Sequence, residues 1–554
     1  MRLVRNITNH FSKAGVSKNI QRTAFHRPWT HTTTMNSGKL IPFFMDEAIP
    51  GETFDAASVR LNALSNTPLV PVMDTAFIDY FFFFIPTRLV WENFREFMGE
   101  NTRGAWDTNL PQRQIPQKDL GTLVDHHNNA CYLGLPMGLP LGDCSVLPFR
   151  SIRHVWNDWF RVQALQDPLM INKGDSDPDY SVGPQNLDLL PVAKFPDYFT
   201  TALPSPQYGE AVSIGLTGDI PVEAIAGKYT PGYGGSSWEV RGNPYLDVGN
   251  NAAYLLVGNP YESSPDISDF YLGVSGVGSG ENLGSDFQST SFSNIWAKGS
   301  EVGAVSINDL RIAFQIQKYK EAQARGGTRY TEILESIWNV SSPDSRLQRT
   351  EYIGGDRVLV NMQQVLQTSS SDAESPQGFA AGFSRTTTSG GRIQYAVPEH
   401  GLIMGFMCIR PTHTYQQGID RFWKKKDVMD FYNPYLANIG EQPVYTYEIY
   451  ADSDEETVFG FQEAWADYRW KRSYVSGEMF SASPNSRDIY HYADFYSEAP
   501  TLSGSWIEED PNLIDRTLAV ASDVADQFKV DIFVDLRSPR PLPAYSIPGL
   551  IDHA

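Results

Sequence analysis

Alternating aspartates near residue 175 have the spacing that opens a calcium-binding loop. Asp175, Asp177 and Asp179 stand at the first, third and fifth positions of such a loop, where carboxylates supply oxygen ligands to Ca²⁺. The sixth position needs Gly for a sharp turn and the twelfth needs Glu, whereas this chain has Tyr180 and Asn186 there. The spacing therefore favours a solvated turn over a calcium site.

Two further groups of polar side chains are candidates for metal binding or acid–base chemistry. His126 and His127 precede Cys131, but no second pair of ligands follows at the spacing of a zinc site. The carboxylates of residues 508–510 stand beside Pro511 and are expected to face solvent. The sequence also has no G-x-x-x-x-G-K-[ST], H-E-x-x-H or G-x-S-x-G motif. We therefore expect no enzyme activity, no cofactor and no bound metal ion.

The N-terminal segment is basic, because no acidic residue precedes Asp46. Asn, Ser and Thr are frequent there, so the segment can bury little and is expected to be flexible or extended. One interpretation is a solvated tail. The other is an arm that contacts nucleic acid through its phosphates, which requires positive charge but no base-specific contact. The candidate contacts are Arg2, Arg5, Lys13, Lys18, Arg22 and Arg27.

Overall composition limits the class of protein. The net charge is −21, from 44 basic and 65 acidic residues, which argues against a protein that coats nucleic acid over its whole surface. The three cysteines include no C-x-x-C pair, so reduced thiols are expected. The N-terminus lacks the apolar segment of a signal peptide, and the apolar run at 80–85 is too short to span a bilayer. We expect a soluble protein.

The elements that must position these residues are predicted to be mainly short strands joined by turns and long loops, because aromatic, Gly and Pro residues are frequent. Helices are predicted where apolar residues recur at helical spacing or a capping box occurs. One such helix begins at Ser306 and ends at Gly326 and Gly327. The other predicted helices lie within 87–98, 149–165 and 333–338, and the predicted strands are 77–85, 402–409, 444–450 and 530–536.

The stretch 205–305 differs from the rest of the chain. It holds 17 of the 44 glycines, with 3 basic against 11 acidic residues, which is typical of a surface insertion with little fixed structure. Its aromatic residues are nevertheless too numerous for a passive linker. We therefore divide the chain into a basic arm (1–37), a first core part (38–204), the insertion (205–305) and a second core part (306–554).

Many segments in series resemble one known family, the major capsid proteins (VP1/F type) of gokushovirus-like single-stranded DNA phages, family Microviridae. The densest resemblance lies in 306–355, with AFQIQK, ARGGTRY and SPDSRLQR, and continues to VLQTS at 365–369. Further segments that resemble the family are GKLIPFFMDEAIPGETF (38–54), FIDYFFFFIPTRLVWENFREFMGE (77–100), VWNDWFR (155–161), EHGLIMGF (399–406), YQQGIDRFW (415–423), GEQPVYTYEIY (440–450), FGFQEAWADYRW (459–470) and RPLPAYSIPGLIDH (540–553).

This resemblance implies a single eight-stranded antiparallel jelly roll with long loop insertions and several helices in the loops. It implies self-assembly into a T=1 icosahedral shell round a circular single-stranded DNA genome, with assembly in the cytoplasm of a bacterial host. It also implies a small basic DNA-binding protein and a pilot protein as partners in the virion. In this context the basic arm is expected to face the interior.

The insertion of related capsids forms protrusions at the threefold axes, and we expect 205–305 to do so and to contact a bacterial surface receptor. The candidate residues are Tyr229, Tyr233, Trp238, Tyr245, Tyr254, Tyr261 and Tyr271. The candidates for contacts between subunits are Arg421, Trp423, Arg469 and Trp470, because arginine and aromatic residues dominate interface energetics. Ordinary core strands are the alternative for these segments. A cell-surface or glycan-binding β-sandwich module is the alternative function, since aromatic side chains also hold sugars.

Overall fold

The structure is a computed structural model that describes residues 21–100, 112–176, 187–209, 307–327, 330–341, 343–366, 380–451 and 456–545, together with short strands between 222 and 297. The chain forms two compact units. One unit comprises Met1–Tyr208 with Glu321–Ala554, and the other comprises Gly209–Lys320. Among the described residues, no helix is both long and apolar enough to cross a membrane.

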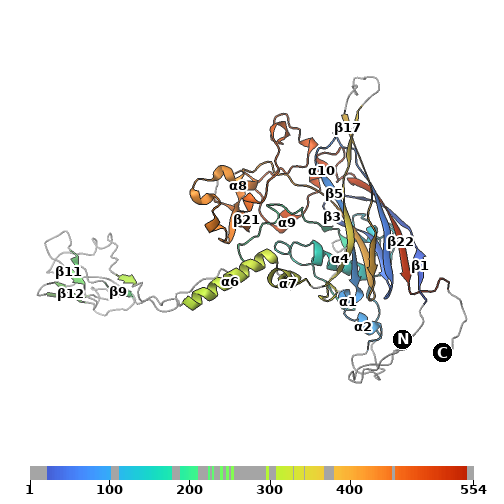
Figure 1. Ribbon diagram of the computed structural model, residues 1–554, viewed down its shortest axis with the longest axis horizontal. Coiled ribbons are helices and arrows are strands. Elements are labelled where there is room, and N and C mark those ends of the chain that lie inside the picture. Colours follow the sequence, from blue (N-terminus) through green and yellow to red (C-terminus); the bar gives the residue numbers. More distant parts are fainter. Residues whose placement is uncertain are drawn as a thin grey trace, which may run out of the picture. The chain divides into compact units, whose positions relative to one another are not determined.

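The first unit contains a seven-stranded antiparallel sheet (Figure 1). Its main path runs β1-β22-β4-β17-β16, while β2 pairs with β22 and β18 pairs with β4. The long strands β4 and β22 lie at its centre and pair from Ser65–Phe528 to Asp55–Arg537, with a register shift between Asp535 and Leu536. The strands are β1 (Thr23–His26), β2 (Trp29–Met35), β4 (Thr53–Ser65), β16 (Met362–Leu366), β17 (Ala380–Ser389), β18 (Ile393–Ala396) and β22 (Phe528–Arg540).

A five-stranded antiparallel sheet faces it, with the order β15-β5-β19-β3-β8. Register shifts occur beside Gly354 and Gly405. At Gly405 an added Cβ would lie 2.8 Å from the Phe43 ring, so the close approach of β3 and β19 requires glycine. The strands are β3 (Lys39–Ala48), β5 (Ala76–Pro86), β8 (Leu190–Pro191), β15 (Glu351–Leu359) and β19 (Gly401–Pro411).

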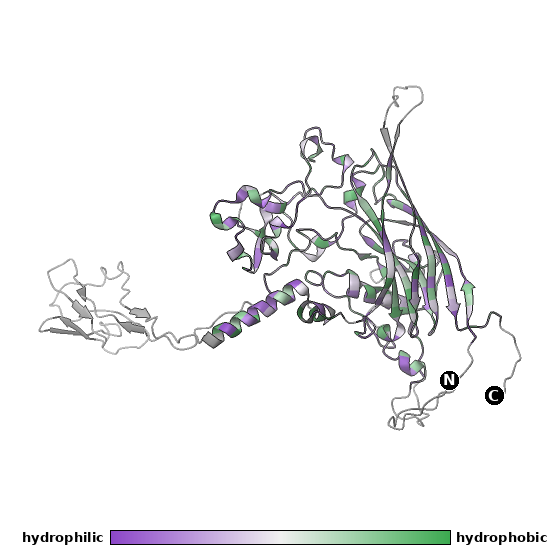
Figure 2. Ribbon diagram, in the orientation of Figure 1, coloured by the Kyte–Doolittle hydropathy of each residue, from purple (hydrophilic) through white to green (hydrophobic). Residues whose placement is uncertain are grey.

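The main hydrophobic core lies between these two sheets. On β22 buried and more exposed residues alternate, with Val530, Ile532 and Val534 in the core, as expected for a sheet with one face exposed. Figure 2 shows hydrophobic and hydrophilic positions interspersed along the strands of this sheet. Strand β5 is different, because Phe82 and Phe84 join this core while Phe83 and Ile85 join a second hydrophobic cluster on the other face. The smaller sheet is therefore buried on both faces.

Helices supply the second cluster. Trp91 follows α1 (Thr87–Val90), and Trp156 follows α4 (Leu147–Val155) and opens a π-helical turn, η1 (Trp156–Phe160). The helix predicted at 149–165 is thus shorter, and that predicted at 87–98 is divided into α1 and α2 (Phe94–Phe97). The remaining elements on this side are α3 (Asn129–Tyr132), β6 (Gln117–Asp119) and β7 (Asp143–Ser145).

A third hydrophobic cluster is formed mainly by residues between 415 and 506, together with Tyr198 and Phe199. The strand predicted at 444–450 is wrong, because only its start belongs to β20 and the chain then turns into α8, where Glu448 caps the backbone of Tyr445. The elements here are η3 (Arg421–Lys424), η4 (Val428–Asp430), η5 (Pro434–Leu436), β20 (Glu441–Tyr445), α8 (Thr446–Ile449), β21 (Val458–Glu463), η6 (Ala466–Tyr468), η7 (Gly477–Met479), η8 (Asp488–Tyr490), α9 (Gly504–Ile507) and α10 (Asn512–Asp515).

Between residues 209 and 338 the elements are helices and short strands. Helix α6 spans Ile307–Gly326 and Gly327 follows with φ 87°, as predicted, and α7 spans Tyr330–Trp338. The strands of the second unit are β9 (Val222–Ala224), β10 (Lys228–Tyr229), β11 (Trp238–Val240), β12 (Tyr245–Val248), β13 (Asn251–Tyr254) and β14 (Ile295–Ala297).

Candidate subunit interface

Exposed aromatic side chains gather in the segments 422–435 and 468–470. The Trp423 and Tyr435 side chains are 75% and 96% exposed, although such large rings are normally covered in a folded chain. Ring contacts join members of this group, since the centroids of Tyr432 and Tyr468 are 6.1 Å apart. We call this group the aromatic surface; it comprises Phe422, Trp423, Val428, Met429, Phe431, Tyr432, Tyr435, Tyr468 and Trp470.

Short 3₁₀ helices hold these side chains outward. At η4 the Asp430 carboxylate accepts hydrogen bonds from the backbone N–H groups of Asp427 and Lys426, at 2.9 and 2.8 Å. These N–H groups lower the pKa of Asp430, because they stabilise its charged form. At η5 the Asn433 side chain accepts from the Tyr435 N–H at 3.0 Å. These side-chain hydrogen bonds satisfy backbone N–H groups at the start of each turn. The short helices can therefore form while their apolar side chains stay at the surface.

Trp465 anchors the aromatic surface to η5 and β20. It is buried and has left-handed backbone geometry, with φ 64°. Its indole N–H donates to the Leu436 carbonyl at 2.9 Å, and its backbone N–H donates to the Gln442 side chain at 3.0 Å. Its ring meets the Tyr432 ring edge-on at 5.8 Å. The segment that carries the aromatic residues is therefore fixed to the body of the first unit.

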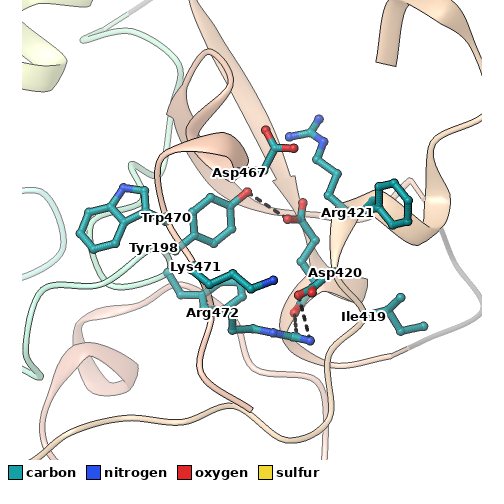
Figure 3. Close-up of a pocket in the computed structure, with 11 residues that line it drawn as sticks. Tyr198, Ile419, Asp420, Arg421, Asp467, Trp470, Lys471 and Arg472 are labelled. Atoms are coloured by element: carbon teal, nitrogen blue, oxygen red, sulfur yellow. Dashed lines mark hydrogen bonds and ion pairs between the residues drawn. The ribbon is translucent and has the colours of Figure 1, made fainter. Parts of the chain in front are cut away.

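A polar cavity of ≈130 Å³ lies beside this surface (Figure 3). On its wall the Tyr198 hydroxyl donates to Glu448 at 2.9 Å, and Arg472 pairs with Asp420 at 3.0 Å. Arg421 also lines it and donates to the carbonyl of Pro443 at 3.2 Å. The charged groups of this wall are thus largely matched by partners within the chain.

Arg421 serves this internal network. Burial by itself would lower its pKa, but the neighbouring Glu448 carboxylate and other groups raise it overall. Its guanidinium also lies 5.5 Å from the Tyr445 ring centroid. Arg421 and Trp423, which are two residues apart, therefore have different surroundings: the guanidinium is bound within the subunit, and the indole is exposed.

The second predicted pair is Arg469 and Trp470, and here too the arginine is paired within the chain while the tryptophan is partly exposed. Arg469 forms an ion pair with Glu463 at 2.5 Å and is half-exposed. Trp470 is 40% exposed and lines the cavity. Sequence reasoning missed Tyr435 and its neighbours, although the run VMDFYNPY offered a signal, since apolar residues there alternate with the capping residues Asp and Asn.

The basic candidates near the N-terminus are only partly described. Arg2, Arg5, Lys13 and Lys18 lie outside the described residues. Arg22 is exposed, and its guanidinium donates to the Thr53 hydroxyl at 3.5 Å.

The surroundings of Arg27 differ from those expected for a DNA-contacting residue of the predicted arm. Its guanidinium lies 2.6 Å from the Asp46 carboxylate and 3.8 Å from that of Glu52, so its charge is matched within the chain. The arm also ends earlier than residue 37, because residues 23–35 form β1 and β2 against β22. Successive residues of β2 alternate between exposed and partly buried, a pattern that composition alone did not reveal.

In the insertion, the backbone places four of the candidate aromatic residues in one antiparallel sheet with the order β10-β11-β12-β13. Tyr229 is in register with Trp238, and Tyr245 with Tyr254. Directly opposed residues are the units of sheet stabilisation. Strand pairing thus brings together aromatic residues that are nine positions apart in the sequence. Tyr233, Tyr261 and Tyr271 lie outside the described residues.

Comparison with known proteins gives consistent matches along the chain. The family model described as "Capsid protein (F protein)" matches residues 14–550. Capsid protein VP1 of Spiroplasma virus 4 is 35% identical, with 96% of each chain covered. Capsid protein VP1 of Bdellovibrio phage phiMH2K is 34% identical over 95% of each chain, and that of Chlamydia phage 1 is 31% identical over 98% of each. The chain therefore belongs to the phage F-type capsid protein family.

Proposed function

We propose that this capsid protein assembles, as copies of one chain, into a T=1 icosahedral shell that encloses a circular single-stranded DNA genome. The observation that carries the proposal is the match to capsid proteins over nearly the whole chain. A cell-surface or glycan-binding module is not favoured, because the same match leaves almost no part of the chain for a separate module. Assembly is expected in the cytoplasm of the bacterial host, and the virion is expected to contain a small basic DNA-binding protein and a pilot protein as well.

We propose that eight strands of the first unit make a jelly roll, the architecture that suits a shell subunit. Support comes from four nested antiparallel pairings: β2 with β22, β3 with β19, β4 with β17 and β18, and β5 with β15. Strands β17 and β18 pair with successive parts of β4 and are counted as one strand. The outermost pair joins the first and last of these strands, and the innermost joins the fourth and fifth. A chain folded as one long antiparallel ribbon and then wrapped into two sheets has this order.

The aromatic surface is proposed as a contact between subunits. A buried ring contributes far more free energy than an exposed one, and Trp and Tyr are enriched among interface residues that dominate binding. Each contact needs to supply only a small free energy, because a closed shell repeats it many times. Trp423 and Tyr435 are the side chains expected to contribute most, since they expose the largest fractions of their rings.

The insertion and the N-terminus have proposed roles at opposite faces of the shell. The strands of the second unit are proposed to form the threefold protrusion that contributes to attachment to the host, and the residues before Thr23 are proposed to contact DNA. A deletion of 222–297 that left host attachment unchanged would contradict the first role. Truncation before residue 22 is expected to reduce DNA retention while assembly persists, and equal loss of both would contradict the second.

The test of the central proposal is electron microscopy of particles formed by the wild-type chain, with an assay for nuclease-protected DNA. Uniform small icosahedral particles that protect single-stranded DNA are expected. The variants Trp423→Ser and Tyr435→Ser are expected to leave circular dichroism and thermal unfolding of the subunit unchanged and to reduce particle yield at least tenfold. Tyr435→Phe is the matched control, because it keeps the ring, and it should assemble normally. Normal particle yield from both serine variants would show that the aromatic surface is not part of the assembly interface.

A further inference from the structure

Asp125, His126 and His127 bring three potential metal-ligand atoms together on the first unit. One atom from each side chain lies within 4.8 Å of the others. Asp125 Oδ1 is 3.9 Å from His126 Nδ1 and 4.0 Å from His127 Nδ1, and the two imidazole rings are 3.9 Å apart. Two imidazole nitrogens and one carboxylate oxygen are a common protein ligand set for Zn²⁺, with water in the fourth position. We propose that this group binds a divalent transition-metal ion, with Zn²⁺ as the best match.

A second carboxylate orients one of these ligands from behind. His127 Nε2 lies 2.6 Å from Asp526 Oδ1, and the Asp526 side chain is only 5% exposed. Asp526 also accepts a hydrogen bond from the Thr34 hydroxyl, which fixes its position. A carboxylate on one ring nitrogen holds the proton there and leaves the other nitrogen, Nδ1, with a free lone pair. Metal-binding histidines almost always have such a partner.

The backbone that carries the ligands is already held in place. The His127 N–H donates to Asp125 Oδ1 at 2.9 Å, and Asn128 caps α3 by accepting from the Cys131 N–H at 2.8 Å. The Tyr132 hydroxyl at the end of α3 donates to the Thr34 carbonyl on β2 at 2.9 Å. The short α3 thus joins the loop to the larger sheet, and the ligands do not depend on a free chain end.

Two of the three donor-atom separations are close to those of bonding geometry. Metal bonds of roughly 2.1 Å at tetrahedral angles place ligand atoms roughly 3.4 Å apart. The carboxylate-to-imidazole distances of 3.9 and 4.0 Å exceed this spacing by about half an ångström. The side chains of Asp125 and His126 are 66% and 57% exposed, so rotation about their side-chain bonds is available.

From the sequence, the two histidines are grouped with Cys131, and no bound metal ion is expected. The group that the structure brings together contains Asp125 instead of Cys131. A bound ion would join the loop before α3, through His127 and Asp526, to the start of β22 and to β2. The ion would therefore stabilise a crossing between a loop and the larger sheet, a role distinct from the proposed subunit contact.

The test is a titration of the full-length, metal-free protein with Zn²⁺ by isothermal titration calorimetry, repeated with Co²⁺ and visible absorption spectroscopy. One equivalent of either ion per chain is expected, and Co²⁺ should give the intense absorption bands of tetrahedral coordination. His126→Ala should abolish this binding without changing the metal-free circular dichroism spectrum. Asp526→Asn should weaken it about 10- to 100-fold, because it removes only the group that orients a ligand.

His26→Ala is the matched control. His26 also contacts an aspartate, with Nε2 2.6 Å from Asp535, but it does not belong to the three-residue group. Its loss should leave the stoichiometry and affinity unchanged. Absence of one-to-one binding by the wild-type protein, or equal binding by His126→Ala, would overturn the proposal.

Discussion

Replacement of His413 by Gln should destabilise the first unit strongly, because its ring bridges two buried carboxylates. Nδ1 lies 2.8 Å from Asp494 and Nε2 lies 2.8 Å from Glu509, and all three side chains are 8% exposed or less. The expectation that the carboxylates of residues 508–510 face solvent is therefore wrong for Glu509. Lys194 adds a weaker contact to Asp494 at 3.9 Å. The variant would leave two buried carboxylates without the cation that bridges them. Removing one partner of a buried ion pair costs about 3–5 kcal/mol, and we expect the free energy of unfolding to fall by that amount.

The same group should give the stability a characteristic pH dependence. Burial by itself would lower the pKa of His413, but the carboxylates of Asp494 and Glu509 more than offset this and raise it to about 10. The ordinary value is 6.5, so the folded state holds a proton that the unfolded state releases. This contribution is fully present below about pH 6.5 and is lost as the pH rises towards 10. At about 1.4 kcal/mol per unit of pKa shift, the wild type should lose roughly 3–4 kcal/mol more than His413→Gln between pH 7 and 10.

The assay is urea unfolding of the purified full-length chain, followed by tryptophan fluorescence at several pH values. Comparison with the variant removes the contribution of lysines and tyrosines that titrate in the same range. His26→Gln is the control, because it makes the same chemical change in an exposed histidine–aspartate pair, and it should alter stability little. The reasoning is refuted if the free energy of unfolding of His413→Gln lies within about 1 kcal/mol of the wild-type value and has the same pH dependence. A change of about 1 kcal/mol is what an average substitution causes.

Two substitutions test the packing of the sandwich. Phe82→Ala should lower the free energy of unfolding by about 3–5 kcal/mol, because this fully buried ring contacts Phe43 and other core rings; a loss below 1 kcal/mol in urea unfolding would contradict the core assignment. Gly38→Ala should prevent accumulation of folded protein, because φ is 78° and the new Cβ would lie 2.4 Å from the Glu509 carbonyl oxygen. Gly51→Ala has a similar φ of 81° but open space, so it should cost only roughly 1–2 kcal/mol, and equal soluble yields of the two variants would refute the steric argument.

Local sequence determined the elements whose stability is local or whose apolar pattern is unambiguous. The aromatic run at 77–85 became β5, because a strand buried on both faces is made mainly of apolar residues; the charged exception, Asp79, is paired with Arg357 and Arg410. The helix end at Gly326 and Gly327 was also read correctly, since a left-handed residue after a helix favours glycine. The family was identified from the order of many short segments, and the comparisons confirm that interpretation.

Tertiary structure decided which charged side chains are paired within the chain and which aromatic side chains are exposed. Arg421 and Trp423 are two residues apart and were both predicted to contact another subunit. Arg421 is nevertheless paired inside the unit, because Pro443 and Tyr445 on β20 lie beside it, whereas Trp423 is exposed. Arg27 was indistinguishable from the other basic residues until β1 placed it beside Asp46. The sequence by itself determined the class of protein, the long helix α6 and the strands β5 and β19, whereas the 13-residue strand β4 was not predicted. The partners of its charges depend on contacts between residues far apart in the chain, and only the folded sheets bring those residues together.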